Sequence, residues 1–79
     1  MPVLRKSKMS HKLIKATLAV EIIKMISEKH GVSQDEALDM FYKSSTAISL
    51  DDESTGLYGQ SALYIFSLFE NEMNSLKNS

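Results

Sequence analysis

The residues of this chain that could carry chemistry are two histidines and ten carboxylates, and the chain has no cysteine. His11 and His30 lie near opposite ends of one expected helix, about 28 Å apart at 1.5 Å per residue. One chain therefore cannot bring them to a common site. No serine stands in a nucleophile-elbow pattern, and no glycine-rich phosphate loop is present. Acid–base catalysis needs a pocket that shifts a carboxyl pKa, which so short a helical chain seldom encloses. The sequence predicts no enzyme and no cofactor.

The acidic run at residues 51–53 is the best candidate for a metal site. With Thr55 and Gly56 it partly matches a calcium loop, which has oxygen ligands at positions one, three and five and glycine at six. That loop also requires a bidentate glutamate at position twelve, where this chain has Ala62. We therefore expect a structural loop or a partner contact here and assign no metal ligand. Calcium or magnesium binding is the alternative.

The net charge of −1 hides a lopsided distribution. Residues 1–15 contain five basic residues and no acidic one, whereas residues 16–79 contain four lysines and ten carboxylates. The basic residues assigned to an N-terminal arm and its end are Arg5, Lys6, Lys8 and Lys12. Such an arm can contact nucleic acid or a membrane surface, but we favour a solvated, frayed N-terminus as the explanation. We predict a flexible basic arm over residues 1–9 and one helical domain over residues 10–79.

Apolar spacing predicts an all-α fold whose first helix has an unusually wide apolar face. Ten of the fourteen residues at 13–26 are apolar and fall into two adjacent stripes. One stripe contains Leu13, Ala16, Val20 and Ile23, and the other contains Ile14, Leu18, Ile22, Met25 and Ile26. A helix of this kind needs neighbours on more than one side. In a chain of 79 residues two other short helices leave part of it uncovered, so we predict a homodimer or a larger protein partner.

Local signals predict a compact bundle of three main helices at about 11–29, 34–44 and 61–76. Gly31 ends the first helix, the Ser33–Glu36 capping box begins the second, and Ser61 caps the third. We expect Ala37, Leu38 and Phe41 to face inward. The third stripe contains Ala62, Ile65, Phe66, Phe69, Met73 and Leu76, with Glu70 and Glu72 exposed. The connection at 44–60 is long for a small domain; we expect a short helical turn near 46–52, with Ile48, Leu50, Leu57 and Tyr58 holding the segment to the core.

Five side chains are candidates for the interface, because exposed apolar helix surface and tyrosine are favoured there. They are Leu13, Val20 and Ile23 on the first helix, with Tyr58 and Tyr64 at the rim. Whether the first or the third helix forms the dimer is left open by the sequence. Helix 11–29 and helix 34–44 also resemble a helix-turn-helix. The second of these helices carries Asp35, Glu36 and Asp39, which would repel DNA phosphates. The basic arm remains the alternative route to nucleic acid.

Residues 22–72 resemble a group of short bacterial all-helical proteins that form a domain of unknown function. The matching segments are 36–38, 41–44, 50–53, 55–58 and 61–65, the most specific being the acid-Thr-Gly-Leu-Tyr-x-x-Ser run. The resemblance implies a binding role, such as an antitoxin-like partner of a larger protein. It also identifies six residues as a matched set: Ser44, Asp52, Thr55, Leu57, Tyr58 and Ser61. We interpret this set as helix caps and turn residues whose side chains satisfy backbone N–H groups.

The sequence predicts a cytoplasmic protein with no membrane partner. A signal peptide needs an unbroken apolar core, which Lys15, Glu21 and Lys24 interrupt. The longest uncharged stretch, residues 54–69, contains two glycines and falls short of a membrane span. The lack of cysteine fits a reducing compartment.

Overall fold

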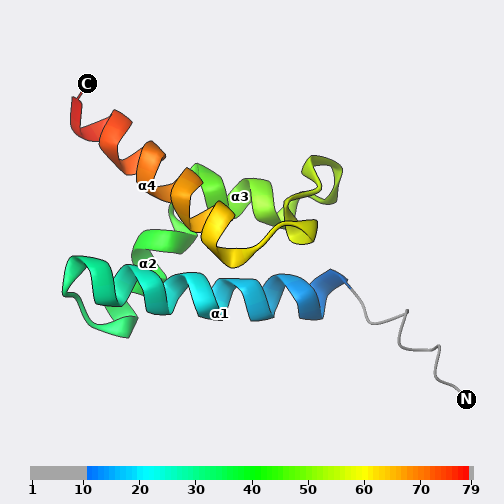
Figure 1. Ribbon diagram of the computed structural model, residues 1–79, viewed down its shortest axis with the longest axis horizontal. Helices are drawn as coiled ribbons and strands as arrows, with labels where there is room; N and C mark the ends of the chain where they lie inside the picture. The colour runs from blue at the N-terminus through cyan, green and yellow to red at the C-terminus, as the bar shows by residue number, and fades with distance from the viewer. Residues whose placement is uncertain (1–10, 79) are drawn as a thin grey trace, which may run out of the picture.

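The computed structural model describes residues 11–78, and the basic arm predicted for residues 1–9 lies outside this range (Figure 1). The described chain contains four α-helices, two short 3-10 helices and no strand. The elements are α1 (His11–His30), α2 (Gln34–Tyr42), α3 (Ser45–Asp51), η2 (Glu53–Thr55), η3 (Leu57–Gly59) and α4 (Ala62–Asn78). The long helix α1 packs against α2, α4 and η3, while α3 packs against α4. In Figure 1 the other helices all lie on one side of α1. The predicted all-α class is confirmed.

Residues 11–78 form four α-helices rather than three because α3 is a complete helix of seven residues. Its cap is Ser44, which has extended backbone angles and whose hydroxyl accepts the N–H of Ala47 at 3.1 Å. The same residue stops α2 at Tyr42, two residues before the predicted end. A serine in extended conformation cannot continue one helix while it caps the next. Helix α4 runs two residues beyond its predicted end, to Asn78.

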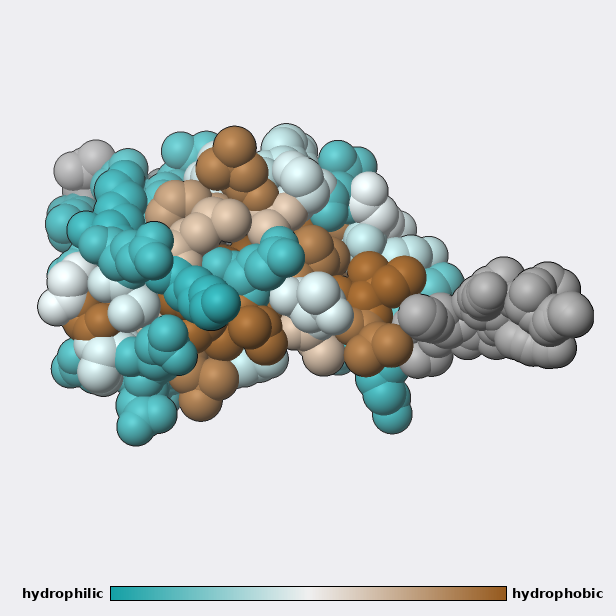
Figure 2. All heavy atoms as spheres, turned by 60° about the horizontal axis from the view of Figure 1, so that its bottom comes forward, coloured by the Kyte–Doolittle hydropathy of each residue, from teal (hydrophilic) through white to brown (hydrophobic). Residues whose placement is uncertain are grey.

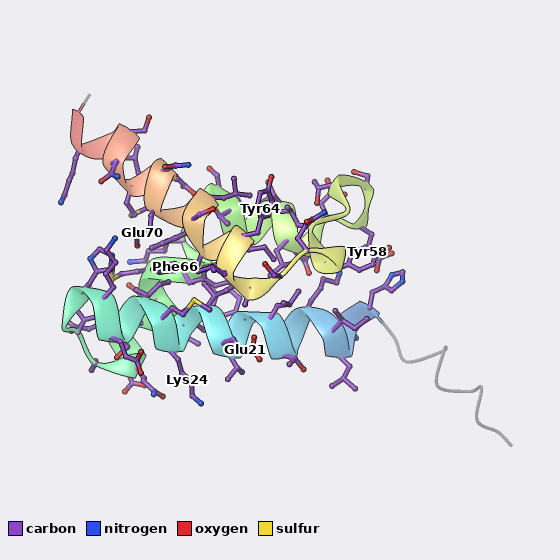
Figure 3. The ribbon with its side chains drawn as sticks, viewed as in Figure 1. Glu21, Lys24, Tyr58, Tyr64, Phe66 and Glu70 are labelled. Carbon is purple, nitrogen blue, oxygen red and sulfur yellow. The ribbon has the colours of Figure 1, made fainter. Side chains whose placement is uncertain are left out.

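The core lies where α1, α2, α3 and α4 meet. Its five largest fully buried side chains are Ile22, Ile26, Phe41, Ile65 and Phe69. Burial of each is worth about 1.5–3 kcal/mol relative to an exposed position. Two of these residues, Ile22 and Ile26, come from the second stripe predicted on α1, and Ile23 of the first stripe is also buried. The face of α1 toward the core therefore takes residues from both stripes, while Leu13, Ala16 and Val20 of the first stripe are exposed. Phe66, a member of the stripe predicted for α4, also points toward α1 in Figure 3 and packs against the core.

Three side chains expected to face inward are exposed instead: Leu38, Ile48 and Leu76. On α2, Ala37 and Phe41 face the core, and Leu38 lies about 100° around the helix from Ala37. On α3, Ala47 and Leu50 are buried, which turns Ile48 outward. The last turns of α4 project beyond the other helices in Figure 1, so that Leu76 passes the end of the core.

Helix α2 begins with the strongest local signal in the chain. The Ser33 hydroxyl accepts the N–H of Glu36 at 3.1 Å, and the Glu36 carboxylate accepts the N–H of Ser33 at 3.3 Å. This capping box satisfies two N–H groups at the helix start and confirms the prediction. Gly31, with φ of 63°, occupies the left-handed conformation that ends α1.

Replacement of Ser33 by alanine should lower the free energy of unfolding by about 1 kcal/mol, because the N–H of Glu36 loses its acceptor. Urea unfolding followed by circular dichroism measures this change. Ser75→Ala, at an exposed serine of α4, is the control and should stay within about 0.5 kcal/mol of the wild type. Equal stability of the two variants would contradict a stabilising role for the capping box.

Candidate interaction surface

The side chains predicted for an interface do not form one surface. Leu13 and Val20 are exposed on α1, and Tyr64 is exposed on α4. In Figure 3, Tyr64 lies on the upper side of α4, whereas Glu21 and Lys24 project from the far side of α1. The tyrosine therefore belongs to a different part of the molecular surface from the α1 stripe.

Two other predicted interface residues contact the chain itself. Ile23 is only 7% exposed and is part of the core, which corrects its assignment to an interface. It lies about 60° around α1 from Val20, close enough for α2 to cover it. Tyr58 is half-buried, and its ring stacks on His11 with ring centroids 4.1 Å apart. This contact holds η3 against the start of α1.

A set of exposed apolar side chains gathers where α1, α2 and α3 adjoin, and we name it the apolar face. Its members are Val20 of α1, Leu38 and Tyr42 of α2, and Ile48 of α3, which are 56%, 47%, 57% and 68% exposed. They lie outside a core that is already closed, because the large residues beneath are fully buried. The apolar face is therefore surface that the fold does not use.

Two shallow depressions connect the members of the apolar face. Val20 and Leu38 line the first, of about 200 Å³, together with Ile23, Lys24, Gln34 and Asp35. Tyr42 and Ile48 line the second, of about 370 Å³, together with Ala47 and Asp51. Leu38 and Tyr42 are four residues apart on α2 and so are neighbours on its surface. Figure 2 brings the α1 side of the molecule forward and shows hydrophobic residues in patches between hydrophilic ones.

Sequence reasoning placed Val20 on this surface but not Leu38 or Ile48. Ala37 and Phe41 form one stripe of α2, while Leu38 and Tyr42 form a second stripe one residue further on. Both stripes have the same spacing, so spacing alone does not say which of them is buried. The pair Leu38 and Tyr42 was nevertheless a usable signal, since two adjacent stripes on a nine-residue helix cannot both face one neighbour.

The acidic run at 51–53 is bound to the start of α1. The Lys15 ammonium donates to the carbonyl of Asp51 at 2.9 Å and lies 3.6 Å from the carboxylates of Asp51 and Glu53. His11 lies 3.4 Å from Glu53, and a hydrogen bond from this histidine lowers the pKa of Glu53. Across residues 11–78, no three His, Cys, Asp or Glu side chains lie close enough together to hold a metal ion. The hydrogen bond and ion pairs of Lys15 and His11 join this run to the start of α1.

The matched set of loop residues forms caps and turns. Asp52 accepts both the N–H and the hydroxyl of Ser54, at 3.0 and 2.7 Å, and these bonds lower the pKa of Asp52. The Thr55 hydroxyl donates to the carbonyl of Ser49 at 2.6 Å. Ser61 accepts the N–H of Tyr64 at the start of α4, at 3.1 Å.

The remaining members of the set bind the connection to the core. Ser44 is buried, caps α3 and donates to the carbonyl of Phe41 at 2.5 Å. Leu57 and Tyr58 pack against the core cluster, as expected, and Leu50 is buried within it. The hydroxyls of Ser44, Thr55 and Ser61 and the carboxylate of Asp52 thus form hydrogen bonds within the chain.

Glu70 and Glu72, which were expected to be exposed, bind other helices. The Glu70 side chain is only 14% exposed and lies 3.0 Å from the Lys29 ammonium and 2.7 Å from His30. Partial burial would raise the pKa of Glu70, but hydrogen bonds from His30 and Lys29 lower it further than burial raises it. These contacts join α4 to the end of α1, and Figure 3 shows Glu70 on the side of α4 that faces α1.

Glu72 binds the start of α3. Its carboxylate accepts the N–H of Ser45 at 2.8 Å, and the N–H and hydroxyl of Thr46 at 2.9 and 2.8 Å. Partial burial would raise the pKa of Glu72, but these hydrogen bonds outweigh it and leave the pKa below its ordinary value. A signal was present in the sequence. Glu72 stands three residues after Phe69 and seven after Ile65, so it falls on the apolar stripe, where a charge requires a partner.

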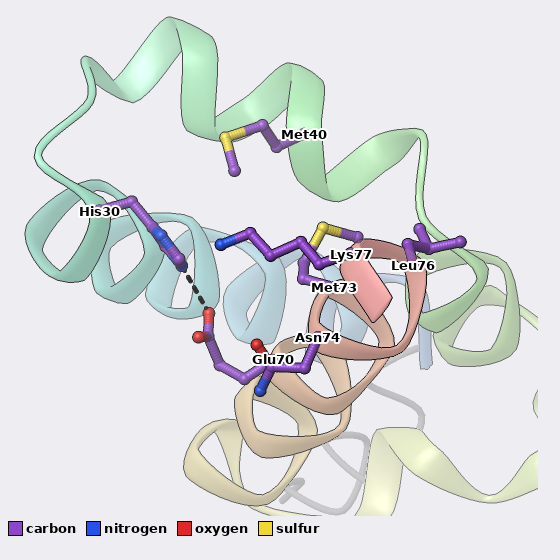
Figure 4. Close-up of a pocket in the computed structure, with 7 residues that line it drawn as sticks. All are labelled: His30, Met40, Glu70, Met73, Asn74, Leu76 and Lys77. Atoms are coloured by element: carbon purple, nitrogen blue, oxygen red, sulfur yellow. Dashed lines mark hydrogen bonds and ion pairs between the residues drawn. The ribbon is translucent and has the colours of Figure 1, made fainter. Parts of the chain in front are cut away.

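A third depression lies between the ends of α1, α2 and α4 (Figure 4). It encloses about 330 Å³, with Met40 and Met73 among its apolar walls. The carboxylate of Glu70 at its edge is already paired with His30, as the dashed line in Figure 4 marks. The depression is thus lined by apolar side chains, and its carboxylate already has a partner within the chain. No unpaired buried charge is present among its described residues to select a ligand.

The chain is a small all-helical protein whose described residues contain no helix both long and apolar enough to cross a bilayer. Comparisons with protein-family models, with curated proteins and with solved structures found no match.

Proposed function

We propose that this protein is an association module that binds a second copy of itself through the apolar face. The single observation that carries the proposal is the exposure of Val20, Leu38, Tyr42 and Ile48 on three adjoining helices. Contiguous apolar surface of this kind marks interaction sites on soluble proteins. A two-fold dimer brings the same patch of both copies together, so that one surface covers the other.

The resemblance to short bacterial helical proteins supports a second form of the same proposal. In that form the chain is the small, antitoxin-like regulatory half of a two-protein system, and the apolar face contacts the larger protein. Both forms of the proposal place the protein in the cytoplasm. Nucleic-acid binding would use Arg5, Lys6 and Lys8, which lie outside the described residues. Self-association is the form that the closed core and the contiguous face favour.

Light scattering of the wild-type chain at high micromolar concentration tests the proposal. The expected result is twice the chain mass of 8.9 kDa. Val20→Glu should weaken association about tenfold or more, because a charge replaces an apolar side chain that each copy buries. Circular dichroism should show unchanged helix content, since Val20 lies outside the core.

Leu63→Glu is the matched control. Leu63 is 67% exposed, more than Val20, but it lies at the start of α4, away from the apolar face. This variant should associate like the wild type. A monomeric wild type would overturn the proposal, and so would dissociation by Leu63→Glu when Val20→Glu leaves the dimer intact.

A further inference from the structure

Two exposed residues of opposite charge lie at the starts of two of the helices that border the apolar face, Lys12 on α1 and Asp35 on α2. Lys12 is exposed at the start of α1. Asp35 is exposed at the start of α2 and lines the depression that Val20 and Leu38 share. Neither residue forms an ion pair within the described chain, whereas the neighbouring Lys15 binds Asp51 and Glu53.

Lys12 and the Asp35 depression lie on the same side of α1. Lys12 precedes Ile23 by eleven residues, about three helical turns, so the two side chains project in nearly the same direction. Ile23 lines the depression that contains Asp35. The separation from Lys12 to Ile23 along the axis is roughly 16 Å at 1.5 Å per residue. Within one chain the ammonium of Lys12 therefore does not reach the carboxylate of Asp35.

The wider charge distribution follows the same pattern, with basic residues before and at the start of α1 and acidic residues on α2. Residues 1–15 carry five basic residues and no acidic one, whereas α2 carries Asp35, Glu36 and Asp39 and is followed by Lys43 at its C-cap. Glu36 is engaged in the capping box, and Asp39 pairs with Lys43 at 2.9 Å. Lys24 lines the Asp35 depression without forming an ion pair with that residue. In a parallel dimer the two basic starts of α1 would lie side by side and repel one another.

We propose that the two copies pack with their α1 helices antiparallel, so that Lys12 of each copy lies against Asp35 of the other. This inference rests on the proposed self-association and adds its orientation. A two-fold axis perpendicular to α1 keeps the α2 side of one copy against the α2 side of its partner. It reverses the helix direction at the same time. The basic start of each α1 then meets the acidic start of the other α2, and the apolar face is covered between them.

Carbodiimide coupling, which joins an amine directly to a carboxylate, tests the orientation on the wild-type chain. Equal amounts of ¹⁵N-labelled and unlabelled protein are coupled at the concentration where light scattering reports a dimer. Mass spectrometry is expected to find Lys12 joined to Asp35 in mixed-isotope peptides. A dimer without this link would overturn the antiparallel orientation but leave self-association intact, whereas a monomer in light scattering would overturn self-association itself.

Charge exchange provides a second test that does not depend on coupling chemistry. Lys12→Glu and Asp35→Lys should each weaken association about threefold to tenfold, because each creates two like-charge contacts per dimer. The double variant should recover to within about twofold of the wild type. Lys77→Glu, at the far end of α4, is the control and should have no effect. Failure of the double variant to recover, in a chain with normal helix content, would contradict the proposed pairing.

Discussion

The Phe41→Ala variant should be largely unfolded at 37 °C, because it loses about 3–5 kcal/mol of stability. Phe41 is fully buried, and its ring lies 6.1 Å, centroid to centroid, from that of Phe69. Truncation removes the buried ring and leaves a cavity in the core that joins α2 to α4. A small domain has a total stability of only about 5–15 kcal/mol, with the shortest chains at the low end. The stability lost with this one side chain is therefore comparable with the total free energy of unfolding.

Helix content measured by circular dichroism at increasing urea tests the Phe41 prediction. Leu63→Ala is the matched control, because Leu63 is a large apolar residue that the fold leaves exposed. It should change the free energy of unfolding by no more than about 0.5 kcal/mol. If Phe41→Ala proved as stable as the control, the burial of Phe41 against Phe69 in the core would be wrong.

The second large effect is expected at Glu72, whose replacement by alanine should cost about 1–2 kcal/mol at neutral pH. The carboxylate binds two backbone N–H groups at the start of α3, where helix N–H groups otherwise lack partners. Its negative charge also interacts favourably with the helix dipole at that end. Removal frays α3 and loosens its attachment to α4. Thermal unfolding of the variant beside the wild type measures the loss.

The contribution of Glu72 should also depend on pH in a defined direction. Its pKa is lower in the folded chain than the ordinary value of 4.5. The stabilisation is therefore fully present above pH 4.5 and is lost as the pH falls through the lower, folded-state pKa. Glu72→Gln, which cannot titrate, should show a smaller fall in melting temperature on acidification than the wild type.

Glu21→Gln is the control for the acid titration. Glu21 is exposed and projects away from the other helices in Figure 3. This variant should retain the acid sensitivity of the wild type. Part of that sensitivity will remain in Glu72→Gln as well, since the pKa of Glu70 is also lowered by its contacts with the end of α1. An unchanged acid response in Glu72→Gln would show that its carboxylate is not the linked group.

The way the helices pack determines which apolar side chains remain exposed for a partner to contact. The core takes Ile22, Ile23 and Ile26 of α1, whereas Val20, on the neighbouring side of the same helix, stays at the surface. Helices α2 and α3 then add Leu38, Tyr42 and Ile48 beside it. The predicted excess of apolar surface thus has a definite place on the molecule, although only part of the predicted residue set lies there.

The sequence by itself determined the features that depend on bonds between near neighbours. The capping box at Ser33 and the cap at Ser61 each satisfy an N–H group three residues further along the chain, and Gly31 supplies the left-handed residue that ends α1. These bonds form whatever the rest of the chain does, so the helix starts are predictable. The stripe of α4 with Ile65 and Phe69 is predictable for the same reason, since its period is a property of the helix.

Only the tertiary structure decided which apolar stripe is covered and which charges are paired. Spacing defines a face of a helix but does not say from which side a neighbour approaches, and so Ile23 is buried while Leu38 is exposed. Glu70 meets His30 across forty residues of sequence, and Glu72 meets Thr46 across twenty-six. Such contacts exist only after α4 has packed on α1 and α3, because the partners share no local geometry.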